Sequence, residues 1–325
     1  MEKRSLGKDG PLVAAIGYGA MVLEGYYGQS DDTRGVATIA EAINLGMMID
    51  TADGYGDGHN EELVGQALAH HVGDAFIATK CGVVFDENEE GTEFPTNWGF
   101  PLTVNGRPDY VSRAIDASLS RLGVDTIDLL YLHFPDPAVP IEDTVGAMAE
   151  AVGAGKVANL GLSNVTAEQT RRAYGVHPIA AVQYEYSLWR REAEAELLPR
   201  LRELGILLVA WSPLGAGFLA GAMNVPAEGD FRQNIPRFSG ENLTANRDRF
   251  APLLDLASEI GATPAQLALS WLLHQGPDII PIPGTRNMTH LHENAGATAI
   301  PLSEDMLAQV DRMAQPGATA GGTLL

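Results

Sequence analysis

Four side chains in the N-terminal half of the chain form a set that could donate a proton to a carbonyl oxygen. They are Asp50, Tyr55, Lys80 and His133. A free tyrosine has a pKa of about 10, too high for an effective acid at neutral pH, and a neighbouring ammonium lowers that pKa. Lys80 could supply the ammonium, Asp50 would keep it charged, and His133 would help to bind the carbonyl oxygen. We predict Tyr55 as the proton donor and the other three as its catalytic partners.

A second group of residues, in the C-terminal half, suits a nicotinamide cofactor. Ser163, Asn164 and Gln183 carry hydroxyl and amide groups that can hydrogen-bond a neutral carboxamide, and Trp211 offers a flat face for its ring. The stretch Pro283-Gly284-Thr285-Arg286 leads into a predicted helix, so its N–H groups and guanidinium could bind a phosphate. Ser212-Pro213-Leu214-Gly215 either receives the pyrophosphate or only begins a helix.

Each of these residues also has a purely structural alternative. Asp50 could only cap the following turn, Lys80 could extend to the rim, and His133 could be a hydrogen-bonded core histidine. Tyr55 could merely pack, and the Gly284 turn with Arg286 could be an ordinary surface feature. Their convergence on one end of the fold favours catalysis. We predict no metal site, because no cysteine or histidine stands at ligand spacing from His133.

The elements that must position these residues alternate between strands and helices. Eight apolar runs are predicted as buried strands, at residues 13–18, 46–50, 75–80, 127–133, 157–163, 180–184, 206–211 and 279–283. Helical spacing occurs at 33–44, 61–70, 109–122, 142–153, 192–204, 264–274 and 303–313.

This alternation predicts a (β/α)8 TIM barrel with an N-terminal β-hairpin. Strands that are apolar on both faces and joined by crossover helices form a parallel sheet, and about eight such units favour closure. No Gly-x-Gly-x-x-Gly follows an early strand, which counts against an open doubly wound sheet. Polar residues at the carboxyl ends of barrel strands share one mouth, where both groups of site residues would meet.

Two predicted connections are longer than is usual in barrels, residues 83–107 after the third strand and about 213–250 after the seventh. The first contains four large aromatic residues, Phe85, Phe94, Trp98 and Phe100. We interpret this loop as a wall of the substrate pocket, with simple packing as the alternative.

The composition indicates one packed globular domain over residues 1–325. Hydrophobic residues make up 45% of the 325 residues and charged residues 19%. This composition is far too apolar for a disordered chain. Glycine and proline are spread along the sequence instead of marking a linker. Residues 315–325, rich in glycine and alanine, are expected to be a mobile tail.

Charge and cysteine usage restrict the partners and the compartment. The net charge of −21 disfavours binding to nucleic acid and to anionic membranes. Cys81 is the only cysteine, so no internal disulfide can form, which fits a reducing cytoplasm. The N-terminus lacks the apolar stretch of a signal peptide, and no segment is long enough to span a membrane. We expect a cytoplasmic protein, and the sequence allows a homo-oligomer.

The motifs resemble those of the aldo-keto reductases over nearly the whole chain. The stretches that match the family in order are Asp50-Thr51-Ala52-Asp53-Gly54-Tyr55-Gly56, Lys80, Asp128-Leu129-Leu130-Tyr131-Leu132-His133, Gly161-Leu162-Ser163-Asn164, Gln183, Ser212-Pro213-Leu214-Gly215 and Ile282-Pro283-Gly284-Thr285. The resemblance implies the tetrad Asp50, Tyr55, Lys80 and His133 and a bound nicotinamide without a Rossmann domain. It also implies that Ser212, Leu214, Gly217, Thr285, Glu293 and Asn294 belong to the cofactor site.

The stretch Tyr184-Glu185-Tyr186-Ser187-Leu188-Trp189 is similar to a bacterial, fungal and plant branch of the family that acts on varied aldehydes, ketones and sugars. Ala216 stands where that branch usually has an arginine, so less charge for cofactor phosphates is expected there. Arg286 and His290 are the residues on which a preference for NADPH over NADH would depend.

The sequence therefore predicts an oxidoreductase that transfers hydride from NADPH to a small-molecule aldehyde or ketone. Tyr55 would protonate the developing alkoxide, and His133 would donate a hydrogen bond to it. Two alternatives stay open. One is a barrel lyase or isomerase that uses Tyr55 and Lys80, and the other is a regulatory subunit that binds the cofactor as a redox sensor.

Overall fold

A parallel sheet of eight strands forms the centre of the computed structural model, which describes residues 1–8, 10–71, 73–86, 88–96 and 101–322. In spatial order the strands are β3 (Tyr18–Gly19), β4 (Ile49–Asp50), β5 (Ile77–Cys81), β9 (Ile127–Leu132), β10 (Val157–Ser163), β11 (Ala181–Glu185), β12 (Leu207–Trp211) and β13 (Ile279–Pro281). Neighbours in space are also neighbours in the chain, as expected when each strand returns through a crossover helix.

Two hydrogen bonds join the first strand to the last and close the sheet into a barrel. The amide of Gly17 donates to the carbonyl oxygen of Pro281 at 3.0 Å, and that of Gly19 donates to Pro283 at 3.4 Å. The backbones approach so closely that a Cβ atom on Gly19 would lie 2.8 Å from the carbonyl oxygen of Ile282. The predicted (β/α)8 barrel is confirmed.

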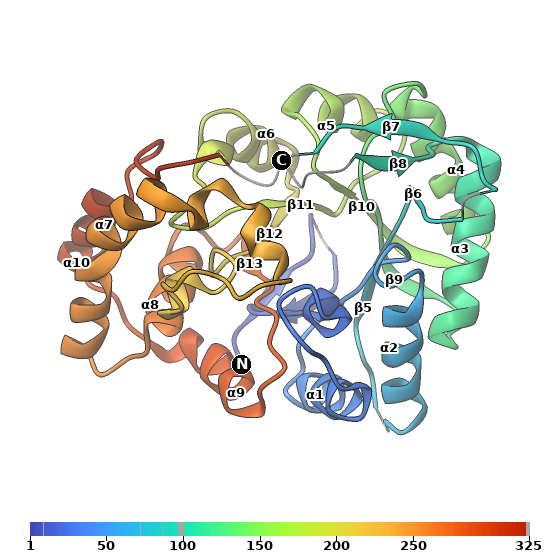
Figure 1. Cartoon of the computed structure of the whole chain (residues 1–325). Helices are drawn as coiled ribbons and strands as arrows, with labels where there is room; N and C mark the ends of the chain where they lie inside the picture. Colours follow the sequence, from blue (N-terminus) through green and yellow to red (C-terminus); the bar gives the residue numbers. More distant parts are fainter. Residues whose placement is uncertain (9, 72, 87, 97–100, 323–325) are drawn as a thin grey trace.

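Ten α-helices are present in the described residues, and Figure 1 shows them around the strands. They are α1 (Asp32–Asn44), α2 (His59–Ala69), α3 (Pro108–Leu122), α4 (Ile141–Gly153), α5 (Ala167–Tyr174), α6 (Leu197–Leu204), α7 (Gly240–Glu259), α8 (Pro264–His274), α9 (Met288–Gly296) and α10 (Glu304–Met313). Gly123 and Gly205 end α3 and α6 in the left-handed conformation that the sequence predicts for them.

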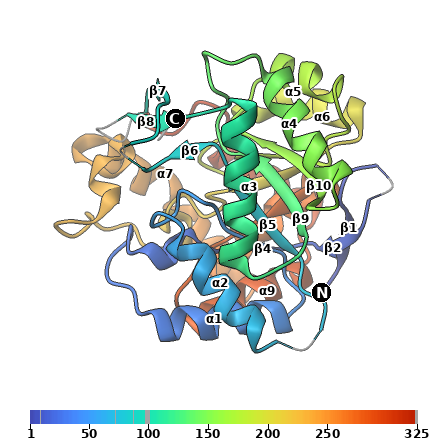
Figure 2. The same cartoon turned by 90° about the vertical axis from the view of Figure 1, so that its right-hand side faces the viewer.

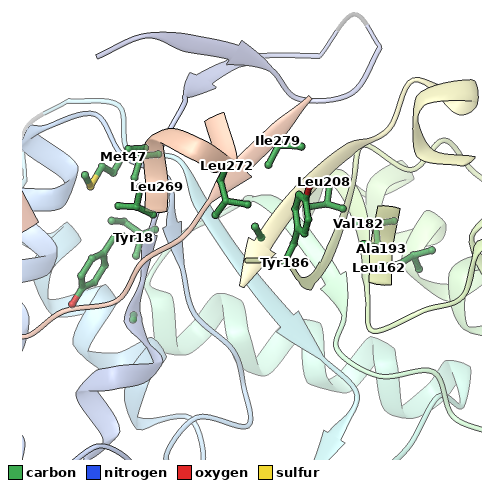
Figure 3. Packing of buried hydrophobic residues seen from close by; sticks show 14 of the residues in the cluster. Tyr18, Met47, Leu162, Val182, Tyr186, Ala193, Leu208, Leu269, Leu272 and Ile279 are labelled. Atoms are coloured by element: carbon green, nitrogen blue, oxygen red, sulfur yellow. The ribbon is translucent and has the colours of Figure 1, made fainter. Parts of the chain in front are cut away.

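The core has two layers. The larger layer lies between strands and helices, and Figure 3 shows part of it, including Leu269 and Leu272 of α8, Leu208 of β12 and Ile279 of β13. The smaller layer uses alternate positions of the strands, such as Leu129 and Tyr131 of β9, and includes Leu6 of the N-terminal segment. Alternation places these side chains on the opposite face of the sheet, inside the barrel.

The predicted N-terminal hairpin is formed by β1 (Lys3–Ser5) and β2 (Leu12–Ala14), which pair antiparallel. Figure 2 shows it at one end of the barrel, with β7 (Thr92–Phe94), β8 (Leu102–Val104) and α7 at the other. Arg4, only 6% exposed, donates to the carbonyl oxygens of Leu273 at 3.0 Å, Gly276 at 2.7 Å and Ile279. One guanidinium thus fastens the hairpin to the last strand and to the turn before it.

Replacing Arg4 by methionine is expected to lower the free energy of unfolding by at least about 2 kcal/mol, because it leaves buried carbonyl oxygens without a donor. Urea denaturation measures this change. Arg200→Met is the matched control, since Arg200 is a partly exposed arginine paired with Glu203, and it should change stability by no more than about 0.5 kcal/mol. Equal stabilities of the two variants would contradict the role given to Arg4.

Three predicted elements differ in the structure. Residues 13–18 do not form one strand, because β2 ends at Ala14 to pair within the hairpin and β3 begins at Tyr18. The predicted helix 192–204 is divided into a short 3-10 helix, Glu192–Glu194, and α6. The predicted connection 213–250 ends early, because α7 begins at Gly240. Its buried residues Leu243, Asn246, Phe250 and Leu253 have helical spacing that the sequence does show.

The C-terminal segment makes specific contacts with the long loop after β12 and with α7. Asn246 exchanges two hydrogen bonds with the backbone of Ala320, at 2.9 and 3.0 Å, and Arg237 donates to the carbonyl oxygen of Gly321 at 3.2 Å. The mobility predicted for residues 315–325 stays a prediction, and these contacts do not favour it for Ala320 and Gly321.

Candidate active site

Asp50, Lys80 and Tyr55 are joined at the carboxyl ends of β4 and β5. Lys80 Nζ lies 2.6 Å from Asp50 Oδ1, 2.9 Å from the carbonyl oxygen of Thr51 and 3.1 Å from the Tyr55 hydroxyl. Lys80 and Asp50 are almost completely buried. The ammonium therefore donates three hydrogen bonds within the site, and one of them goes to the phenol of Tyr55.

The loop that carries Tyr55 is fixed at both ends. Thr51 donates to the side chain of Asn60 at 2.7 Å, and Asn60 donates to Glu24 at the same distance. The amide of Asn60 donates to the carbonyl oxygen of Tyr55 at 3.3 Å. Gly56, with φ of 57°, allows the turn between them. The position of the phenol is thus set by the start of α2 as well as by β4.

Charge in this site differs from the sequence prediction in one respect. Burial lowers the pKa of Lys80, but Asp50 and Tyr55 outweigh it and hold that pKa above its usual range, so the ammonium persists. For Tyr55, burial raises the pKa and outweighs the opposing effect of Lys80. The predicted lowering by Lys80 is present, but burial sets the direction of the whole shift. Removal from water destabilises the Tyr55 phenolate more than the ammonium of Lys80 stabilises it.

His133 lies beside the phenol at the carboxyl end of β9. Its ring meets the Tyr55 ring edge to face, with 5.7 Å between centroids, and stacks on Phe134 at 4.7 Å. Burial and the charge of Lys80 hold the pKa of His133 well below its usual range. The imidazole is therefore neutral, and its buried Nδ1 has no hydrogen-bond partner in the described part of the chain.

These directions predict the pH dependence of the carbonyl reduction that the sequence leads us to expect. Because the pKa of Tyr55 lies above its ordinary 10.0, the phenol stays protonated, and the neutral His133 does not titrate near neutrality. The kcat for reduction should be flat between about pH 7 and pH 9 and should fall only as pH rises through the Tyr55 pKa. A steady-state pH profile at saturating substrate tests this, and an inflection near neutrality would contradict it.

A cavity of about 820 Å³ opens above the tetrad and gathers the predicted residues. Asp50, Tyr55 and His133 line it, whereas Lys80 reaches it only through its contacts with Asp50 and Tyr55. The predicted cofactor residues that line the cavity are Ser163, Asn164, Gln183, Trp211, Ser212, Leu214, Gly217, Gly284, Thr285, Arg286, His290, Glu293 and Asn294. The structure thus brings the two predicted groups together, and their roles stay predictions.

The end of the cavity nearest the tetrad holds a network of amides. Gln183 donates to Asp50 Oδ2 at 2.6 Å, so it links the predicted cofactor residues to the catalytic carboxylate. Asn164 donates to Ser163 at 3.0 Å and accepts from Trp211 Nε1 at 3.2 Å. Asn164, like Ser212 and Ala216, has a positive φ, and such strain in non-glycine residues concentrates at functional sites.

Arg286 at the other end is occupied by backbone contacts. Its guanidinium donates to the carbonyl oxygens of Tyr27 at 2.7 Å, Gln29 at 2.6 Å and Gly28. Asn287, which the sequence analysis missed, also lines the cavity and caps α9 by accepting from the amides of Thr289 and His290. A phosphate at this end would share Arg286 with the loop 27–29.

The described part of the long connection after β5 contains a small antiparallel sheet of β6 (Val83–Val84), β8 and β7. Phe85 lines the cavity and is 38% exposed. Phe94 packs on Phe134, another lining residue, with 5.1 Å between centroids. Trp98 and Phe100 lie outside the described residues. The described side chains on this side of the cavity are apolar, and the substrate wall stays a prediction.

Several lining residues were not predicted, above all Tyr26, Tyr27, Phe231 and Arg232. They lie in two connections that carry no recognisable motif. Phe231 donates its amide to the carbonyl oxygen of Tyr26 at 3.1 Å, so the two connections meet across the cavity. No local pattern in the sequence indicates a contact between residues about two hundred positions apart.

Comparison with known proteins identifies the family. The model of the aldo/keto reductase family matches residues 15–315. The chain belongs to this family. It is 42% identical to a probable aldo-keto reductase 1 of Glycine max over 98% of this chain and 90% of that protein. It is 40% identical to the aldo-keto reductase yakc of Schizosaccharomyces pombe, whose name includes NADP(+), over 94% and 89% of the two chains.

Solved structures of other aldo-keto reductases share the barrel. A glycerol dehydrogenase from Gluconobacter oxydans superimposes with a TM-score of 0.82 at 31% identity, over 96% of this chain and 94% of that one. An aldo/keto reductase from Klebsiella pneumoniae, solved in complex with NADP and acetate, has a TM-score of 0.75 at 27% identity, with coverage of 100% and 99%. The family and the fold inferred from sequence motifs are thereby confirmed.

The described residues contain no group of three or more histidine, cysteine, aspartate or glutamate side chains that could hold a metal ion. Within them, no helix has the length and apolar character needed to cross a membrane.

Proposed function

We propose that this aldo-keto reductase transfers hydride from NADPH to an aldehyde or ketone, with Tyr55 as the general acid. The observation that carries the proposal is the buried ammonium of Lys80, 2.6 Å from Asp50 and 3.1 Å from the Tyr55 hydroxyl at the base of the cavity. Such a chain stabilises the phenolate that remains when the phenol gives up its proton.

The bound nicotinamide would supply the hydride. Tyr55 donates its proton to the carbonyl oxygen as negative charge develops there, and Lys80 moderates the charge left on the phenol. His133, a neutral imidazole with an N–H donor, offers a second hydrogen bond to the same oxygen. Asp50 keeps Lys80 protonated and in place.

The residues of the cavity fit a nicotinamide dinucleotide. Asn164, Ser163 and Gln183 present amide and hydroxyl groups beside Tyr55, and the half-buried Trp211 offers a ring face. Arg286 lies where a phosphate-bearing end would lie. The relatives named with NADP support the phosphorylated cofactor. The apolar side formed by Val83, Phe85 and Phe134 favours a carbonyl substrate with an apolar group.

The experiment is to measure consumption of NADPH and NADH by fluorescence with a panel of aldehydes, ketones and sugars. We expect one alcohol formed for each NADPH consumed. Tight NADPH binding without turnover on any carbonyl would instead indicate a regulatory cofactor-binding protein, and conversion of an enolisable substrate without NADPH would indicate a lyase or isomerase.

A further inference from the structure

Asp57 is a carboxylate at the tetrad end of the cavity to which the proposed function gives no role. It stands two residues after Tyr55, is exposed and lines the cavity. Four non-glycine residues in the described part of the chain have a positive φ, and all of them line the cavity: Asp57, Asn164, Ser212 and Ala216. Because such backbone strain concentrates at functional sites, the position of Asp57 calls for a function.

The turn that carries Asp57 is fixed on both sides. The glycines that flank it are also left-handed, with φ of 57° and 91°. A Cβ atom on Gly56 would collide with the carboxylate of Glu24, and one on Gly54 would lie 3.1 Å from Val83 on the apolar side of the cavity. The backbone therefore holds Asp57 between Glu24 and the predicted substrate wall.

The other carboxylates at this end have cationic partners. Asp50 lies 2.6 Å from Lys80. Glu24 lies 3.1 Å from Nδ1 of His59, and hydrogen bonding to Glu24 raises the pKa of that histidine. Asp57 makes no ion pair and no side-chain hydrogen bond with the described residues, so its charge is uncompensated.

The two arginines that line the cavity are occupied by other partners. Arg232 lies 2.6 Å from Asp230, and Arg286 donates to three backbone carbonyl oxygens. Neither forms an ion pair with Asp57. A ligand at the tetrad end therefore meets the negative charge of Asp57.

Aromatic rings complete the surroundings of Asp57. Burial raises the pKa of the Tyr26 phenol, and the charges of Glu24 and Asp57 raise it further, so the phenol stays uncharged beside them. Tyr26 meets Phe231 edge to face, with 6.2 Å between centroids, and both residues line the cavity. Aromatic faces and a carboxylate both attract a cation, whereas the carboxylate repels an anion.

We propose that Asp57 selects the carbonyl substrate by its charge. It favours a compound with a cationic group beyond the carbonyl and disfavours one with a carboxylate or phosphate there. The inference rests on the proposed function, because it needs a carbonyl group bound at Tyr55. A substrate held at Tyr55 and extending along Val83 passes the turn of Asp57, where its far end meets the carboxylate.

The test measures kcat/KM for three benzaldehydes that carry trimethylammonium, hydrogen or carboxylate at the para position, with saturating NADPH. The proteins are wild type, Asp57→Asn and the control Asp125→Asn. Asparagine tolerates the left-handed backbone, so the turn should be kept. Asp125 is an exposed aspartate in the turn before β9, at the amino ends of the strands, and its replacement changes the net charge equally.

Asp57→Asn should reduce the preference for the cationic over the anionic aldehyde by roughly tenfold, because an exposed charge pair changes affinity a few-fold and the ratio counts that change twice. Asp125→Asn should keep the wild-type preference. Intrinsic differences in reactivity among the aldehydes cancel, since each ratio is compared between proteins. In wild type the preference should also weaken as the salt concentration rises.

Two results would overturn the proposal. One is an unchanged preference in Asp57→Asn, and the other is an equal loss of activity with all three aldehydes, which would mean that the residue only shapes the turn. Failure of the wild-type protein to reduce any carbonyl would instead contradict the proposed function. Thermal unfolding of each variant checks that the barrel is intact.

Discussion

Replacing Tyr55 by phenylalanine is expected to reduce kcat for carbonyl reduction by about 10²–10⁴-fold, the usual contribution of a positioned general acid. The change removes one hydroxyl, which contacts Lys80 at 3.1 Å, and keeps the ring that packs against His133. The site should therefore keep its shape. Single-turnover reduction of a carbonyl by NADPH measures the chemical step directly.

The cofactor dissociation constant of Tyr55→Phe should stay within about twofold of wild type, which is a difference in binding free energy of well under 1 kcal/mol. Tyr174→Phe, which alters a tyrosine on the outer helix α5, is the matched control and should keep full activity. Normal turnover in Tyr55→Phe would falsify the assignment of the acid.

Replacing Lys80 by methionine should abolish activity and also destabilise the protein. The substitution leaves the carboxylate of Asp50 buried without its cation, although Gln183 still donates to it, and loss of one partner of a buried pair typically costs about 3–5 kcal/mol. Urea denaturation and kcat measure the two effects. Asp50 then either stays as an isolated charge or takes up a proton, and neither state supports Tyr55.

A second variant separates stability from catalysis. In Asp50→Asn/Lys80→Met both charges are absent, so much of the lost stability should return, because a neutral pair of similar volume costs far less to bury. Activity should not return, since no ammonium remains near the phenol. Recovery of activity in the double variant would show that the charge of Lys80 is not needed.

The barrel and the position of the tetrad could be predicted from the sequence because both depend on short-range patterns. Asp50, Lys80 and His133 each stand where an apolar run meets a polar residue near the end of a strand, and the closed parallel sheet brings those ends to one mouth. Helix α5 was missed although Thr166 and Gln169 form a capping box at its start. Helix α5 has few apolar residues, so no helical spacing of apolar residues indicated it.

What the sequence could not show depends on contacts between distant loops and on burial. Arg232 and Tyr27 are neighbours only because two connections cross the cavity, and neither connection has a pattern that fixes its path. The sign of the Tyr55 pKa shift likewise depends on how far the phenol is removed from water. A sequence indicates which charges are near but not how much solvent is excluded.

The seam between β3 and β13 has a consequence for how the protein is made on the ribosome. Gly17 and Gly19 bond to Pro281 and Pro283, and Arg4 bonds to the carbonyl oxygen of Ile279, so residues 4–19 must wait for residues 279–283 to be synthesised. During most of synthesis the nascent chain exposes an unpaired strand edge, which can pair with another chain. The unpaired edge at this seam should therefore determine how much the nascent chain needs chaperones and how readily C-terminally truncated products aggregate.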